Sequence, residues 1–117
     1  MSKPVGPYTP AVRAGDLIVV SGQLGLVDGA IVGGGVPTQT AQAIANLKTH
    51  LASMGASIGD VFKTMCFLTD MDNFEAFNAA YVDGFGEHRP ARSTVAVAGL
   101  PMGGLVEIEA WAHVPLG

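Results

Sequence analysis

The sequence predicts a single α+β domain in which two helices pack on one face of a mixed β-sheet. Segments with strand-like alternation lie near both ends of the chain, and two segments between them have the apolar spacing of amphipathic helices. The element order strand, strand, helix, strand, helix, strand, strand is typical of this fold class. Because 117 residues suffice for one core and little more, we expect one domain spanning residues 1–117.

The first elements expected are two strands, at Val12 and at residues 17–21. A tight turn at Gly15-Asp16 would join them. Residues 27–36 are rich in glycine and predict turns and a flexible loop. No Gly-Lys-Ser/Thr follows these glycines and no GxGxxG opens a helix, so a phosphate-binding loop is not predicted.

Two helices flank a central strand in the predicted order. The first would run from Thr38 to about Met54 and end at Gly55. Residues 61–68 form an apolar run of strand length with both faces covered. The second helix would start at an Asp72 N-cap and end at Gly84 and Gly86. We interpret its aromatic stripe as core: Phe74, Phe77, Tyr81 and Phe85.

The last two strands, in residues 90–97 and 106–111, place ionisable groups among small and apolar side chains. Strand alternation separates Val95 and Val97 from Arg92 and its neighbours on one strand, and separates Glu107 from the apolar residues of the other. We expect one sheet face, turned away from the helices, to carry the following residues: Arg92, Thr94, Ala96, Glu107, Glu109 and Trp111. Such a face suits neither solvent nor an isolated core, so the sequence predicts a closed homo-oligomer that covers it.

Arg92 and Glu107 are the candidate functional residues on this face. A guanidinium fork matches a carboxylate, and a glutamate can activate water, so a site for a small carboxylic acid is one interpretation. A structural ion pair between the two residues is the other, and the pattern alone does not separate them.

Composition narrows the possible partners. The chain is 49% hydrophobic and 14% charged, and its net charge of -4 offers no basic stripe for nucleic acid.

No run is long enough to span a bilayer and the start lacks an apolar signal core, so we expect a cytoplasmic protein. The lone Cys66 is expected to be buried and structural. No metal site is expected, because His50, His88 and His113 lack ligand spacing.

Several ordered motifs resemble the RidA/YjgF family of reactive intermediate deaminases. The match runs from Gly6-Pro7-Tyr8 to Ala112. Its most specific parts are Pro90-Ala91-Arg92-Ser93, Leu100-Pro101 and Val106-Glu107-Ile108-Glu109-Ala110, with support from Val20-Ser21-Gly22-Gln23, Gln39 and Asn46. The resemblance implies a chorismate-mutase-like α+β fold, with the last strand inside the sheet. It also implies a homotrimer whose clefts lie between subunits.

The resemblance further implies hydrolysis of enamines and imines, such as 2-aminoacrylate, to 2-keto acids and ammonia without a cofactor. Arg92 would hold the substrate carboxylate and Glu107 would position and polarise the attacking water. The remaining residues implied to line the cleft are Tyr8, Ser21, Gly22, Asn78 and Thr94.

The chain departs from the family pattern in two places, of which the first bears on substrate preference and the second removes any role for a thiol. The segment Gly86-Glu87-His88-Arg89 before Pro90 is short and lacks the usual aromatic residue, and Thr94 stands where many relatives have cysteine. Two other functions stay open: a non-catalytic binder of 2-keto acids, and a ribonuclease or translation inhibitor. The acidic balance and missing basic groove argue against the latter.

Overall fold

The sheet has five strands, and its topology follows the predicted fold class. The computed structural model describes residues 4–117. Met1, Ser2 and Lys3 belong to the start of the chain that is expected to lack an apolar signal core, and they lie outside the described residues. The strand order is β1-β2-β7-β5-β6, so the last strand pairs with β2 and β5 in the middle of the sheet, as the family resemblance implies. The strands are β1 Ala11–Ala14, β2 Leu17–Leu24, β5 Val61–Leu68, β6 Ala91–Ala96 and β7 Val106–His113.

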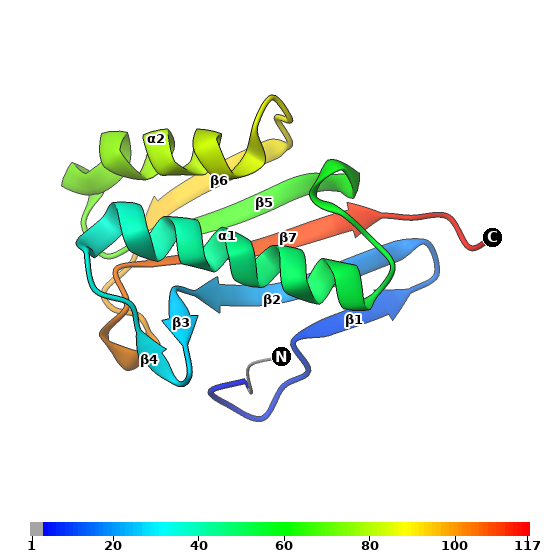
Figure 1. Cartoon of the computed structure of the whole chain (residues 1–117), viewed down its shortest axis with the longest axis horizontal. Helices are drawn as coiled ribbons and strands as arrows, with labels where there is room; N and C mark the ends of the chain where they lie inside the picture. Colours follow the sequence, from blue (N-terminus) through cyan, green and yellow to red (C-terminus); the bar gives the residue numbers. More distant parts are fainter. Residues whose placement is uncertain (1–3) are drawn as a thin grey trace.

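Two helices cover one face of this sheet and leave the other uncovered in the protomer (Figure 1). Helix α1 (Gly35–Ser53) contacts β2 and β7, while α2 (Phe74–Phe85) lies beside α1 over the other half of the sheet. The helices approach closely at Gly84, where a Cβ would lie 2.5 Å from Ile44 Cδ1. Gly84 therefore lies inside α2 as a packing residue, and Gly86, with a φ of 66°, ends the helix.

The core lies between the helices and the sheet. Strand β5 alternates as a half-covered strand does, because Thr64, Cys66 and Leu68 are buried against the helices while Met65 and Phe67 on its other face are only half-buried. The largest fully buried side chains of the core are Phe77, Ile18, Ile44, Leu47, Leu51, Leu68 and Ile108.

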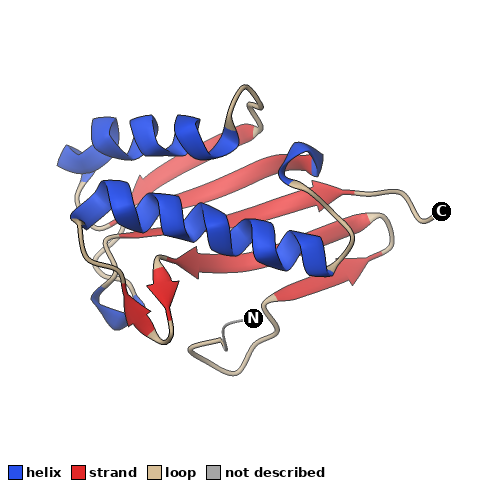
Figure 2. Ribbon diagram, viewed as in Figure 1, coloured by secondary structure: helices blue, strands red, loops and turns tan. Residues whose placement is uncertain are grey.

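Two predicted local features differ from the structure. Asp72 does not cap α2; it lies in a short 3-10 turn, Met71–Asn73, whose N-cap is Asp70, and the Asp70 side chain accepts a hydrogen bond from the Asp72 amide at 2.9 Å. The glycine-rich segment expected to be a loop contains a small hairpin, β3 (Leu26–Val27) and β4 (Ala30–Ile31), which turns at Asp28 and Gly29, both of positive φ (Figure 2). The dipeptide suits this turn, because aspartate and glycine tolerate the left-handed region.

The predicted division of the β6 face was also wrong in its direction. Arg92 and Thr94 pair with the buried Thr64 and Cys66 of β5, so they face the helices, and Val95 faces the uncovered side. On this edge strand the apolar residues are not the ones that face the helices. Arg92 faces them instead, because the aromatic rings of α2 cover it.

The uncovered face is rich in apolar side chains. Val12, Val95 and Trp111 are 49%, 38% and 41% exposed, and the half-buried Met65 and Phe67 lie on the same face. Glu107 and Glu109 interrupt it. None of the helices within residues 4–117 has the length and apolarity needed to cross a membrane.

Candidate functional site

Arg92 lies on a platform of three aromatic rings from α2. Its Cζ is 4.9 Å from the ring centroid of Tyr81 and 5.6 Å from those of Phe74 and Phe77. Such stacking holds a guanidinium without using its N–H donors. Among residues 4–117, no hydrogen bond or ion pair joins the Arg92 guanidinium to another group, so these donors remain available to a ligand.

Two further side chains beside Arg92 lack partners. The Asn78 Oδ1 and Thr94 Oγ1 atoms are buried and accept no hydrogen bond in the part of the chain that the structure describes. Asn78 and Arg92 line a surface depression of about 260 Å³ between α2 and the start of β6. Buried polar atoms are rarely unpaired, so this combination indicates a binding site for a polar ligand.

The platform itself is anchored by a buried hydrogen bond. The Tyr81 hydroxyl lies 2.7 Å from the Thr64 Oγ1 on β5. Burial raises the pKa of Tyr81, so the phenol stays neutral. Three residues of the aromatic stripe predicted as core are buried, Phe77, Tyr81 and Phe85, whereas Phe74 is 36% exposed and covers Arg92 from the surface.

Glu107 lies on the other face of the sheet, against a bulge in β2. The register between β2 and β7 shifts between Val20 and Gln23, so Ser21 and Gly22 form the bulge. A Cβ at residue 22 would lie 2.6 Å from the Glu107 Cδ, so only glycine leaves room for this carboxyl group. Burial, and then the neighbouring charge of Glu109, raise the pKa of Glu107, so its carboxylate is a stronger base than that of an ordinary glutamate.

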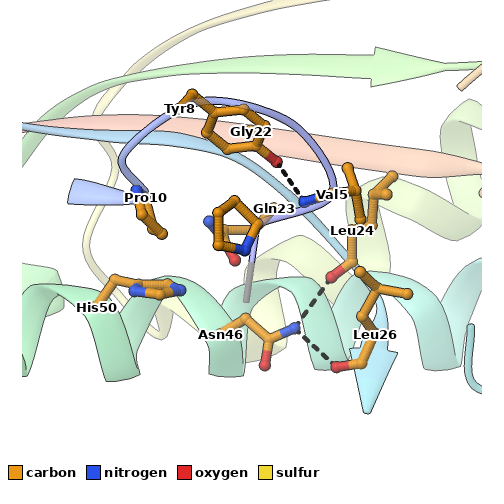
Figure 3. Close-up of a pocket in the computed structure, with 10 residues that line it drawn as sticks. Val5, Tyr8, Pro10, Gly22, Gln23, Leu24, Leu26, Asn46 and His50 are labelled. Atoms are coloured by element: carbon orange, nitrogen blue, oxygen red, sulfur yellow. Dashed lines mark hydrogen bonds between the residues drawn. The ribbon is translucent and has the colours of Figure 1, made fainter. Parts of the chain in front are cut away.

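Tyr8 and Gly22 also line a small cavity bounded by the N-terminal segment, the β2 bulge and α1 (Figure 3). Its volume of about 20 Å³ suits a single water molecule. The Tyr8 hydroxyl accepts a weak hydrogen bond from the Val5 amide at 3.4 Å, and the Ser21 Oγ donates to the Pro10 carbonyl at 3.2 Å. The N-terminal segment is thus held beside the bulge.

The seven predicted site residues fall into two groups. Asn78, Arg92 and Thr94 lie on the helix side of the sheet, and Glu107 lies on the uncovered side against Gly22. Ser21 shares the bulge with Gly22, and Tyr8 lines the small cavity that Gly22 shares with α1. The register is decisive, because Arg92 pairs with Thr64 and Thr64 with Ala110, three residues from Glu107 and hence on the opposite face. A structural ion pair between Arg92 and Glu107 within one protomer is therefore excluded.

The supporting motif residues hold loops in place. Asn46 donates from Nδ2 to the carbonyls of Leu24 and Leu26, both at 3.0 Å (Figure 3). Gln39 accepts a hydrogen bond from the Leu105 amide at 2.8 Å. These contacts join α1 to the ends of the strands that carry Gly22 and Glu107.

Sequence reasoning missed two residues, Arg89 and His50. Arg89 lines the depression that contains Arg92, and its position just before Pro90 is the signal that could have identified it. His50 is buried on α1 beside the small cavity, with no partner for Nδ1 among the described residues, and burial lowers its pKa. No signal in the sequence marks His50.

Cys66 lies in the core between the sheet and the helices. Cys66 is fully buried, and burial raises the pKa of its thiol to about 11, so it is the structural residue expected. Among residues 4–117, no three His, Cys, Asp or Glu side chains are grouped as metal ligands would be.

Comparison with known proteins gives consistent matches across nearly the whole chain. Residues 1–114 match the family model described as Endoribonuclease L-PSP. A RutC family protein of Pyrococcus horikoshii is 42% identical over 113 residues, which cover 95% of this chain and 90% of that protein.

Solved structures agree in fold and sequence. The RidA structure from an Antarctic Psychrobacter is 37% identical, with a TM-score of 0.91 and coverage of 96% of this chain and 92% of that one. A Mycobacterium tuberculosis structure, described as a member of the YjgF/YER057c/UK114 family, is 36% identical, with a TM-score of 0.81 and coverage of 92% and 86%. The chain therefore belongs to the YjgF/YER057c/UK114 family, which includes RidA and the Endoribonuclease L-PSP and RutC proteins.

Proposed function

We propose that this protein hydrolyses reactive 2-imino acids and their enamine tautomers, such as 2-aminoacrylate, to 2-keto acids and ammonia. One observation carries the proposal. A guanidinium with available donors is held on aromatic rings beside unpaired Asn78 and Thr94 oxygens, which suits a small carboxylic acid with a polar nitrogen.

The proposed site combines two protomers. Arg92, Asn78 and Thr94 of one protomer would face Glu107, Ser21, Gly22 and Tyr8 of its neighbour. Because the two groups lie on opposite faces of one sheet, their meeting requires a head-to-tail contact, and such contacts close into rings. We propose a homotrimer, and the apolar uncovered face supports it, since large exposed apolar surfaces are uncommon on monomers.

The chemistry needs only water and these side chains. Arg92 binds the substrate carboxylate through its two-pronged donor set. The imine reacts in its protonated form. The Glu107 carboxylate accepts a proton from water as the water oxygen bonds to the carbon and the C=N pair of electrons moves to nitrogen, giving a neutral carbinolamine. Glu107 returns that proton to the nitrogen and takes up the hydroxyl proton as the C–N bond breaks and the C=O bond forms; ammonia leaves, and the last proton passes to it or to solvent. We propose no metal or other cofactor.

The raised pKa of Glu107 supports this role, because a base is most effective when its pKa lies near the working pH. The preformed carboxylate site supplies orientation. Thr94 replaces a thiol common in relatives, which this scheme does not use.

The direct test is turnover. The protein is added to 2-aminoacrylate or to an imino acid released by an amino acid oxidase, and 2-keto acid formation is followed. We expect a faster rate than the uncatalysed decay. Unchanged decay together with retained 2-keto acid binding would support the non-catalytic binder instead.

The family description names a ribonuclease activity, but no observation here favours it for this chain. The net charge of -4 leaves little attraction for a phosphate backbone. RNA cleavage that persists in purified Arg92→Ala would contradict this exclusion.

A further inference from the structure

The depression that contains Arg92 has a second guanidinium. Its lining residues are Asn78, Tyr81, Val82, Arg89, Pro90 and Arg92. Two of the chain's six lysine and arginine residues thus line one hollow of about 260 Å³, and no carboxylate is among the lining residues. Like charges in one small site repel each other, and a bound anion would offset that repulsion.

Arg89 is fixed by its surroundings. Its Nη1 donates to the carbonyls of Gly86 and, at 3.0 Å, of His88. The His88 Nε2 donates a hydrogen bond to the Val61 carbonyl, 2.6 Å away, and this contact ties the connection to β5. Pro90 restricts the backbone of Arg89 further. Only Nη1 is used by these hydrogen bonds, so Nη2 and Nε remain for a ligand.

The shortness of the connection places Arg89 there. Helix α2 ends at Phe85 and β6 begins at Ala91, so five residues join them. The segment holds Arg89 directly before Pro90, two residues before β6 begins. A guanidinium at this position gives the depression an anion-binding character.

From this arrangement we propose that the site prefers imino acids with a second carboxylate, that is, the imines of dicarboxylic amino acids. The inference rests on the proposed function for the role of Arg92. Arg92 holds the carboxylate next to the reacting carbon, and Arg89 holds the carboxylate at the far end of the substrate.

Binding of matched 2-keto acids tests this preference without requiring turnover. The probes are 2-oxoglutarate and 2-oxopentanoate, which have equal chain length and differ in the terminal carboxylate. By calorimetry at low ionic strength, we expect the wild-type protein to bind 2-oxoglutarate about five- to tenfold more tightly. In Arg89→Gln this ratio should fall to about one, and Arg89→Lys should keep part of it.

Arg13→Gln is the matched control. Arg13 also donates from Nη1 to two backbone carbonyls, those of Gly15 and Val114, but it lies on β1 at the opposite edge of the sheet. This variant should keep the wild-type ratio of the two affinities. Its unfolding temperature shows how much stability is lost when an arginine no longer binds backbone carbonyls. If Arg89→Gln fails to fold, Arg89→Lys and the wild-type ratio still test the inference.

Equal affinities in the wild type, or a preference that persists in Arg89→Gln, would overturn the inference. The two proposals fail separately. Imine hydrolysis with no preference for a second carboxylate removes this inference alone, whereas Arg89-dependent 2-oxoglutarate binding without any imine hydrolysis removes the proposed function alone.

Discussion

Gly22 lies directly against the carboxyl group of Glu107, on the uncovered face of the sheet. A Cβ at residue 22 would lie 2.6 Å from the Glu107 Cδ and 2.8 Å from its Oε1. The bulge in β2 therefore determines where this carboxyl group lies.

Gly22→Ala should displace Glu107 and lower kcat about 10- to 100-fold, since small misplacements of a catalytic group are costly. The φ of Gly22 is not positive, so the backbone accepts alanine and the effect comes from contact with Glu107. Initial rates of 2-keto acid formation measure it. Gly99→Ala is the control, because nothing lies within 4 Å of its Cβ position. Normal kcat in Gly22→Ala would contradict the role of the bulge.

Arg92→Ala and Arg92→Lys should each lower kcat/KM about 100-fold or more. Neither side chain reproduces the paired donors that the carboxylate needs. Sedimentation should show unchanged assembly, and Arg13→Lys should keep wild-type turnover. Full activity in Arg92→Lys would refute a two-pronged contact.

Mixed assemblies should recover activity that each variant lacks. Arg92→Ala and Glu107→Gln protomers are mixed, dissociated and reassembled. A cleft that takes Arg92 from one protomer and Glu107 from its neighbour is then intact in about a quarter of cases for random mixing. Absence of recovery, with mixed assemblies verified by mass spectrometry, would place the site within one protomer.

Turnover should fall at acidic pH through the pKa of Glu107. The ionised form of Glu107 is the base, so kcat falls as this carboxylate is protonated. Because the pKa of Glu107 is raised, this acid limb of the pH profile should be centred above about 4.3, the pKa of an ordinary glutamate. Glu109→Gln removes a repelling charge, so the pKa of Glu107 should fall and the limb should move to lower pH. Glu75→Gln, on the helix layer, should leave the limb in place. A shift of the acid limb of kcat to higher pH in Glu109→Gln would contradict this electrostatic account.

Tyr81→Phe should lower the free energy of unfolding by about 1–2 kcal/mol, because it leaves the buried Thr64 hydroxyl without its 2.7 Å partner. Thr64→Val should cost a similar amount by leaving the Tyr81 hydroxyl unpaired. The double variant should be less destabilised than the sum of the two, since neither polar group then remains. Urea unfolding of the four proteins measures this coupling, and strict additivity would argue against it.

Periodicity was sufficient to predict the fold class, the two helices and the strands of the main sheet, but it did not predict the β3–β4 hairpin. The apolar spacing predicted α1 and α2 to within a few residues, and the run at residues 61–68 matches β5. The N-cap at Asp72 was wrong because Asp70, two residues earlier, caps a 3-10 turn that precedes the helix. Local sequence signals do not distinguish these two caps, since both positions hold aspartate.

Periodicity could not predict which side chains of β6 point toward the helices. Alternation separates Arg92 and Thr94 from Val95, but it does not say which set meets the helices. The expectation that apolar residues face inward fails here, because a layer of aromatic rings covers Arg92 while Val95 remains on the uncovered side. Grouping Arg92 with Glu107 on one face was the result of that expectation.

The central place of β7 has a consequence for synthesis of the chain. β2 and β5 have no direct pairing with each other, and β7 (Val106–His113), which lies between them, is synthesised after both. Until β7 emerges, β2 and β5 each expose an unpaired backbone edge that could recruit other nascent chains. The sheet therefore closes only after β7 has been synthesised, and truncation after α2 should yield an insoluble fragment instead of a smaller folded unit.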